Sequence, residues 1–148
     1  MRLILTRRGG YGVRMLAHLA TLDAGTQITS AALGEACDVP RGNVPTIVNR
    51  LSRAGLLVCT PGRGGGCCLA RDASGISSLE IIEALEGPIE ENVCLLDGLR
   101  CDDKETQCVM HPTWVAGRQG VIDSFASTSL AELARRTTSG PGGDAPVS

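Results

Sequence analysis

Residues 56–70, LLVCTPGRGGGCCLA, contain two short apolar runs separated by a turn that is rich in glycine. Leu56–Thr60 and Cys67–Ala70 both have the composition and length of a β-strand. Between them lies the turn Pro61–Gly66, in which Arg63 is the only charged residue. Strand, glycine-rich turn and strand predict a β-hairpin that presents Arg63 at its tip.

Two helices are predicted before residue 40. The first spans Tyr11–Leu22, because its apolar residues recur every three or four positions. Its predicted inner residues are Val13, Leu16, Ala17 and Ala20. The second is capped by Thr29 or Ser30 and ends before Pro40. Its predicted inner residues are Leu33, Ala36 and Cys37.

A third helix is predicted to begin at Asn43 or Val44 and to end near Ala54. Pro45 sets this start, because proline is tolerated only in the first turn and disfavours helical geometry in the residue before it. Gly55 follows the helix and suits a left-handed cap. The predicted buried stripe is Ile47, Val48 and Leu51. Three helices followed by a hairpin predict a mainly α fold, the winged helix-turn-helix.

The charge of the chain is unevenly distributed and favours double-stranded DNA as a partner. Residues 1–71 carry nine arginines against three acidic side chains, whereas the remaining residues carry five basic and thirteen acidic ones. A cationic first half is typical of a nucleic-acid-binding surface, although scattered solvated arginines remain the alternative. The third helix is the one expected in the major groove. The candidate DNA contacts are Arg41, Asn43, Thr46, Asn49, Arg50, Arg53 on a phosphate, and Arg63 in a minor groove or on a phosphate.

The second half of the chain predicts further helices around a loop at residues 89–111. A helix capped by Ser77 or Ser78 and ending at Glu86 has the predicted inner residues Leu79, Ile82 and Leu85. Pro112 opens a longer helix whose apolar stripe, which suits a two-fold dimer interface, is Trp114, Gly117, Val121, Ile122 and Phe125. A last helix is expected over Leu130–Arg136. The predicted domains are a winged helix-turn-helix at 1–76, a cluster loop with dimerisation helices at 77–136, and a disordered tail at 137–148.

The 89–111 loop contains a candidate metal site, Cys94, Cys101, Cys108 and His111, with the spacing C-x6-C-x6-C-x2-H. Thiolates and an imidazole are ligands for zinc or for an iron–sulfur cluster, and this spacing leaves both open. We expect Cys37 and Cys59 to be inward-facing structural residues, and Cys67 and Cys68 to face opposite sides of a strand.

Other features exclude several classes of protein. The chain has no run of about 18 apolar residues and no signal-peptide pattern at its start, so we expect a cytoplasmic protein that does not span a membrane. Seven cysteines, an odd number, argue against a disulfide framework. The sequence contains no C-x-x-C motif and no recognisable nucleophile pattern, so we expect no enzyme and no small-molecule substrate.

Several motifs together resemble a known family, the iron–sulfur-dependent winged-helix regulators typified by IscR and its nitric-oxide-sensing relatives such as NsrR. The similarity extends from Met1 to about Arg136 and rests on the following segments: Met1-Arg-Leu, Tyr11-Gly-Val-Arg-Met-Leu, Arg50-Leu-Ser-Arg-Ala-Gly-Leu-Leu, Gly62-Arg-Gly-Gly-Gly, Asp72-Ala-Ser-Gly-Ile, Glu86-Gly-Pro, the three loop cysteines, His111 and Trp114. The resemblance implies a homodimeric repressor that binds a near-palindromic operator. Its affinity would depend on a 2Fe–2S or 4Fe–4S cluster that senses iron, redox or nitric oxide status.

The resemblance also assigns the fourth cluster ligand. His111 matches the histidine ligand of the assembly-regulator branch, whereas Gly10 stands where the nitric-oxide branch has a ligating aspartate. We therefore expect a 2Fe–2S cluster, with a structural zinc ion and no sensing role as the alternative. The chain departs from the family in longer gaps between its cysteines and in Cys67, which replaces a tyrosine. Because of Pro45, and of Asn43 in place of another tyrosine, the family's base contacts are not transferred to this chain.

Overall fold

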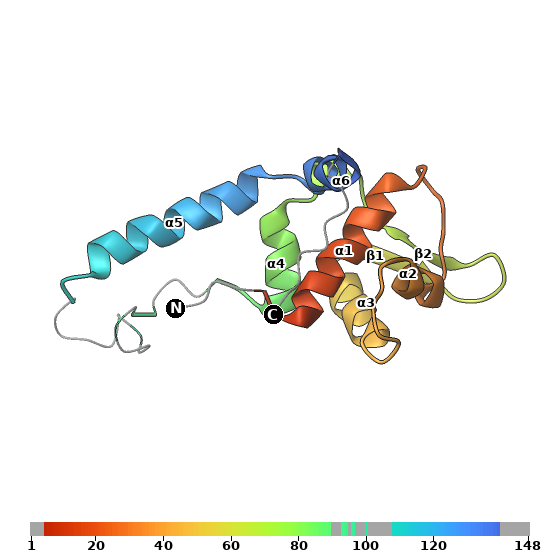
Figure 1. Cartoon of the computed structure of the whole chain (residues 1–148), viewed down its shortest axis with the longest axis horizontal. Helices are drawn as coiled ribbons and strands as arrows, with labels where there is room; N and C mark the ends of the chain where they lie inside the picture. The colour runs from red at the N-terminus through yellow and green to blue at the C-terminus, as the bar shows by residue number, and fades with distance from the viewer. Residues whose placement is uncertain (1–4, 90–92, 95, 97–99, 101–107, 140–148) are drawn as a thin grey trace.

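The computed structural model describes residues 5–89, 93–94, 96, 100 and 108–139. In chain order the elements are α1 (Arg7–Thr21), α2 (Ser30–Ala36), α3 (Val44–Arg53), β1 (Leu57–Thr60), β2 (Gly66–Leu69), the 3-10 helix η1 (Ala73–Gly75), α4 (Ser78–Glu86), α5 (His111–Ser127) and α6 (Leu130–Ser139). Figure 1 shows a body of helices with the β1–β2 hairpin on one side and α5 leaving it on the other. The predicted mainly α winged-helix fold is confirmed.

The core forms around α1, which packs against α2, α3, α4, α6 and β2. Met15 and Leu16 of α1 are fully buried, and so is Leu130 of α6, which returns to the same core late in the chain. Gly12 lets α4 approach α1 closely, since a Cβ atom there would lie 2.5 Å from Leu85 Cδ2. Helices far apart in the sequence therefore share one hydrophobic cluster.

Helix α1 begins four residues earlier than its predicted start at Tyr11. The Thr6 hydroxyl caps it by accepting a hydrogen bond from the Gly9 N–H at 3.1 Å. Glu86 of α4 fixes this cap, because its Oε1 accepts from both the backbone N–H and the hydroxyl of Thr6. A threonine followed by charged residues and two glycines carries no apolar period, so the extra turn escaped prediction.

The predicted inner faces of α2 and α4 need correction. Leu33 and Cys37 are buried as expected, but Ala36 is exposed. On α4 the buried apolar residues are Ile81 and Leu85, whereas Leu79 and Ile82 are only half-buried. The buried face is decided by the packing of α4 against α1, α3 and α5, which the apolar spacing of α4 alone does not specify.

Helix α3 begins at Val44, within the predicted range, with Asn43 at its cap. Ile47 and Leu51 are fully buried, and Val48 is half-buried. Gly55 has a φ of 70°, the left-handed conformation expected where the helix ends.

The hairpin is antiparallel, and its register pairs Leu57 with Leu69 and Cys59 with Cys67. Beyond this two-stranded sheet, Ile28 forms an isolated antiparallel bridge with Cys67. The expectation that Cys59 faces inward is wrong, because Cys59 is exposed and forms a disulfide with Cys67. The odd cysteine count gave no sign of this pair, since the register that brings the two sulfur atoms together is a property of the folded hairpin.

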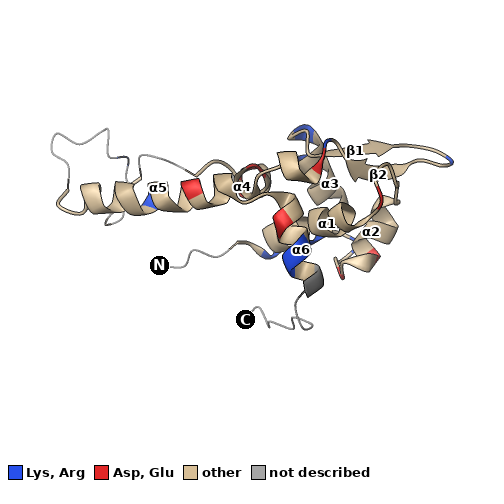
Figure 2. Ribbon diagram, turned by 90° about the horizontal axis from the view of Figure 1, so that it is seen from above, with Lys and Arg blue, Asp and Glu red and all other residues tan. Residues whose placement is uncertain are grey.

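Helix α5 extends away from the body (Figures 1 and 2). Its last turn is attached to α4, since Ser78 donates from its hydroxyl to the Phe125 carbonyl and from its N–H to the Thr128 carbonyl, both at 2.7 Å. Helix α6 continues to Ser139, past its predicted end at Arg136, and the rest of the predicted tail, 140–148, lies outside the described residues. Among the described helices, none is both long and apolar enough to cross a membrane.

Candidate DNA-binding surface and metal site

Helices α2 and α3 form a helix-turn-helix whose turn is held by local backbone contacts. The N–H of Val39 donates to the Gly34 carbonyl at 2.9 Å, and Asp38 adopts a φ of 52° between them. Gly34 has no side chain to obstruct Val44, whose Cγ2 would lie 2.6 Å from a Cβ atom there. This close approach places the start of α3 directly against α2.

The outer face of α3 presents polar side chains. Ile47 and Leu51 are fully buried on its inner side. Thr46, Asn49 and Arg53 are exposed on the other side at spacings of three and four residues, so they share one face. An exposed amide, hydroxyl and guanidinium on one helical face are the donors and acceptors that base edges and phosphates require.

The remaining candidates on the helix-turn-helix are partly engaged within the chain. Arg50 donates to the Leu85 carbonyl at the C-terminal end of α4, so its guanidinium links α3 to α4. Arg41 forms an ion pair with Glu35 at 2.9 Å, but the two side chains are 90% and 63% exposed. Such an exposed pair is weak and does not hold Arg41 away from another anion. The half-buried Asn43 makes no capping hydrogen bond through its side chain to the described backbone.

The β1–β2 hairpin is the wing of the fold. Arg63 lies exposed in its turn, and Figure 2 shows a basic residue at the tip of the hairpin. The turn is closed by a hydrogen bond from the Gly65 N–H to the Gly62 carbonyl at 3.1 Å. A Cβ atom at Gly65 would lie 2.2 Å from the Thr60 carbonyl oxygen, so the turn requires glycine there. The wing therefore projects a single guanidinium on a narrow backbone.

Two arginines that were not among the predicted DNA contacts lie beside α3. Arg7 and Arg8 occupy the exposed first turn of α1. They line a groove of about 660 Å³, together with Asn43 and Arg50. Their adjacency was a usable signal, but the predicted helix began one turn too late to place them next to α3.

The candidate metal site is only partly within the described residues. Cys94 is 3% exposed, and its Sγ lies 3.7 Å from the Sγ of the half-buried Cys108. Two thiolates bound at about 2.3 Å to one tetrahedral metal ion lie about 3.8 Å apart, so the pair fits a shared metal. Cys101 lies outside the described residues. Among those that are described, no three histidine, cysteine, aspartate or glutamate side chains form a metal-binding group.

His111 is the first residue of α5 and follows Cys108 closely in the chain, but its side chain does not complete a three-ligand group with Cys94 and Cys108. Its backbone N–H donates to the Cys108 carbonyl at 3.0 Å. Its Nδ1 is buried and has no hydrogen-bond partner among the described residues. A buried imidazole nitrogen without a partner is costly, and metal coordination is one way to satisfy it.

Trp114 fastens the beginning of the cysteine loop to α5. Its Nε1–H donates to the Val93 carbonyl at 2.8 Å. Val93 in turn pairs with Arg100 in an antiparallel bridge. The residue that precedes Cys94 is thus attached to the helix that begins at His111.

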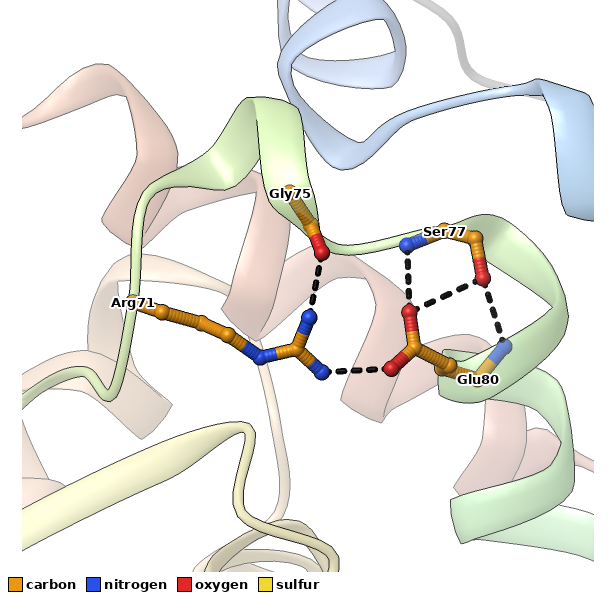
Figure 3. Close-up of polar contacts among 4 residues, drawn as sticks. All are labelled: Arg71, Gly75, Ser77 and Glu80. Carbon is orange, nitrogen blue, oxygen red and sulfur yellow. Dashed lines mark hydrogen bonds and ion pairs between the residues drawn. The ribbon is translucent and has the colours of Figure 1, made fainter.

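The base of the wing is joined to α4 by a polar network (Figure 3). Arg71, which follows β2, donates to the Gly75 carbonyl and to the Glu80 carboxylate. Glu80 also accepts from the Ser77 N–H at 2.8 Å. The Ser77 N–H and, next, the Arg71 guanidinium lower the pKa of Glu80.

Cys37, the remaining buried thiol of the helix-turn-helix, is a structural residue. Burial raises the pKa of this thiol, and its Sγ lies 3.7 Å from the Arg14 carbonyl. The thiol therefore stays protonated and is poorly suited to bind a metal ion.

The profile of one protein family, Rrf2, matches residues 5–136 and is described as that of iron-dependent transcriptional regulators. The chain belongs to the Rrf2 family. It is accordingly a DNA-binding transcriptional regulator with a winged-helix fold, and its relatives are regulators rather than enzymes.

Individual Rrf2 proteins resemble the chain over most of its length. The HTH-type transcriptional regulator IscR of Xenorhabdus nematophila is 29% identical over 136 residues, which cover 88% of this chain and 79% of that protein. The structure of CymR, the global cysteine regulator of B. subtilis, matches with a TM-score of 0.73 at 26% identity and covers 92% of this chain and 99% of its own. The structure of T. potens IscR has the same fold, with a TM-score of 0.74 at 22% identity over 95% and 94% of the two chains.

Proposed function

We propose that the protein is a homodimeric repressor whose affinity for its operator is controlled by an iron–sulfur cluster. The proposed ligands are Cys94, Cys101, Cys108 and His111. Two observations carry the proposal: the pair of sulfur atoms 3.7 Å apart, and the buried Nδ1 of His111, which has no partner among the described residues. Three thiolates and one histidine favour 2Fe–2S over 4Fe–4S, by analogy with centres that combine both ligand types.

The bound cluster would supply a charge and a geometry that change with iron, redox or nitric oxide status. A change in the state of the cluster would change the position of α5. His111 begins this helix, and Trp114 joins it to the residue before Cys94. The far end of α5 is attached to α4 through Ser78, so a change near its start alters how the helix leaves the body.

Homodimerisation through α5 is proposed from its exposure. None of the residues of α5, all of which the structure describes, is buried. Trp114, Val121, Ile122 and Phe125 are half-buried on a helix that extends from the body (Figure 1). A second copy packing along this face would cover them and give a two-fold arrangement.

The dimer would bind a near-palindromic operator whose half-sites lie about one helical turn of DNA apart. We assign Thr46, Asn49 and Arg53 to the major groove and its flanking phosphates. Arg63 enters the adjacent minor groove or contacts a phosphate. Arg41 and Asn43 extend this surface, and Arg50 contributes mainly by positioning α3 against α4.

The test is anaerobic purification followed by analysis of metal content, acid-labile sulfide and visible absorbance. The proposal expects about two iron atoms and two sulfides per chain. Replacing Cys94, Cys101 and Cys108 together by alanine should abolish both signals, whereas Cys37→Ala should keep them. If the triple variant retained the iron, the sulfide and the operator affinity of the natural chain, the proposal would be wrong.

A structural zinc site is the second candidate, because a sulfur separation of 3.7 Å fits zinc equally well. The Cys108-x2-His111 spacing is also typical of zinc ligands. The same analysis distinguishes the two: about one zinc per chain without sulfide favours zinc and removes the sensing role.

A further inference from the structure

The wing contains a disulfide between two cysteines that face each other across β1 and β2. Cys59 and Cys67 are register partners, with Cα atoms 4.0 Å apart and sulfur atoms 2.01 Å apart. The N–H of Cys67 donates to the Ile28 carbonyl at 2.6 Å, and its own carbonyl accepts from the Ile28 N–H at 3.1 Å. Both polar groups of Cys67 therefore point away from β1. The two cysteines thus form a non-hydrogen-bonded pair, the kind that brings cross-strand side chains closest together.

The two cysteines differ in accessibility. Cys67 is 2% exposed, whereas Cys59 is exposed. An open pocket of about 320 Å³ lies beside the disulfide and is also lined by Thr29, Thr60 and Pro61. Because Cys59 is the exposed residue of the pair and Cys67 is buried, we expect a small oxidant or a thiol from solvent to react first at Cys59.

The disulfide lies at the base of the segment that carries Arg63. One further residue pair, Thr60 with Gly66, separates it from the turn. Gly62 and Gly64 have φ values of 93° and 73° on either side of Arg63, so the turn has little steric restriction of its own. The disulfide is the covalent restraint nearest to Arg63, and it adds to the hydrogen bond from the Gly65 N–H to the Gly62 carbonyl that closes the turn.

We propose that Cys59 and Cys67 form a reversible dithiol–disulfide couple that controls the order of the wing tip and thereby the affinity for DNA. The disulfide form presents Arg63 in fewer conformations and so binds DNA more tightly, because less conformational entropy is lost on binding. This redox site is separate from the proposed cluster ligands in residues 94–111. Its effect on affinity rests on the proposed contact between Arg63 and DNA, whereas the couple itself does not.

A hydroperoxide serves as the oxidant. The Cys59 thiolate attacks the hydroperoxide and becomes a sulfenic acid, and one alcohol molecule, or water in the case of hydrogen peroxide, leaves. The Cys67 thiol then attacks the sulfenic sulfur, the S–S bond forms, and the hydroxyl group leaves with the thiol proton as water. Reduction begins when an external thiolate attacks Cys59, which releases the Cys67 thiolate, and a second thiol completes it. Two thiols and one hydroperoxide thus give one disulfide, one alcohol and one water.

The chemical test is a redox titration of the full chain in buffers of reduced and oxidised glutathione, followed by acid quenching and tryptic mapping. Cleavage after Arg53, Arg63 and Arg71 places Cys59 in one peptide and Cys67 in the next, so the disulfide appears as two joined peptides. Because Cys68 shares the second peptide, the titration is repeated on Cys59→Ser and on the matched control Cys68→Ser. The couple is supported if Cys68→Ser keeps the reversible transition and Cys59→Ser loses it. It is overturned if the natural chain shows no reversible joined peptide, or if Cys68→Ser removes it.

The functional test measures DNA affinity of the oxidised and reduced forms at fixed salt. The expected loss on reduction is roughly three- to tenfold, and Cys59→Ser should resemble the reduced form under both conditions. Arg63→Ala separates the two parts of the proposal. If it binds DNA as tightly as the natural chain does, the Arg63 contact is wrong even though the couple stands. If it binds more weakly and the natural chain still shows no effect of reduction, the control of affinity by the disulfide is wrong. Circular dichroism of each variant confirms that it folds.

Discussion

Replacing Trp114 by phenylalanine tests whether the cysteine loop is fastened to α5. The substitution keeps an aromatic ring on the helix but removes the donor of the 2.8 Å hydrogen bond to the Val93 carbonyl. Val93 is half-buried, so its carbonyl regains water only in part. The start of the loop should then separate from α5 more often.

The magnitude follows from the one bond that is lost. A hydrogen bond of this kind contributes about 0.5–1.5 kcal/mol net, and a poorly solvated acceptor left behind adds to the cost. A total of about 1–2 kcal/mol corresponds to a roughly five- to thirtyfold increase in the open fraction of the loop. The free energy of unfolding of the winged-helix core should change little, because Val93 and Trp114 lie outside its buried cluster.

Two rates measure the effect. Amide hydrogen exchange at residues 93 and 94 reports loop opening in the metal-free chain, and transfer of the bound metal to a chelator reports it in the loaded chain. Both should rise by the stated factor in Trp114→Phe. They should remain unchanged in Val109→Ala, which alters a side chain that is 91% exposed nearby. Equal rates in Trp114→Phe and the natural chain would refute the proposed attachment.

Three further changes address the wing and its base. Arg63→Ala should lower DNA affinity and reduce the slope of log affinity against log salt by about 0.9, as one lost phosphate contact requires, whereas Arg136→Ala on α6 should leave the slope alone. Gly65→Ala should weaken DNA binding, because its Cβ would lie 2.2 Å from a backbone oxygen, while Gly75→Ala, which meets nothing within 4 Å, should not. Glu80→Gln should destabilise the fold near neutral pH, and the loss should become progressively smaller below pH 4.5, the ordinary pKa of a glutamate. The reason is that the Glu80 carboxylate, whose pKa is lowered in the folded chain, stabilises the fold while it is ionised and no longer does so once it is protonated. Urea unfolding between pH 7 and pH 3 measures this, and a constant difference between the two proteins would contradict it.

The elements that sequence could predict are those specified by local chemistry. Pro45 and Gly55 determined both ends of α3 correctly, because proline and glycine restrict the backbone at their own positions. The glycine-rich turn predicted the hairpin for the same reason. The start of α1 at Arg7 was missed because Glu86, distant in the sequence, helps to fix its cap.

In the candidate sites, too, some features follow from the local sequence and others depend on distant contacts. The exposed face formed by Thr46, Asn49 and Arg53 follows from helical periodicity alone. The engagement of Arg50 by α4 and the pairing of Cys59 with Cys67 depend on tertiary contacts and register, which residue types do not specify. A side chain's type therefore indicated what it can bind, but the fold decides which side chains are already bonded to another part of the chain.

In the proposed function, the state of the cysteine and histidine site controls DNA binding. The most direct measurement is the affinity for operator DNA of one anaerobic preparation before and after removal of its metal, with the wing disulfide held in one state throughout. We expect the affinity to change at least about tenfold, within the usual range of coupling between two sites. The variant in which Cys94, Cys101 and Cys108 are alanine should show no change under the same treatment. Equal affinities of the loaded and metal-free natural chain would show that the site does not control DNA binding.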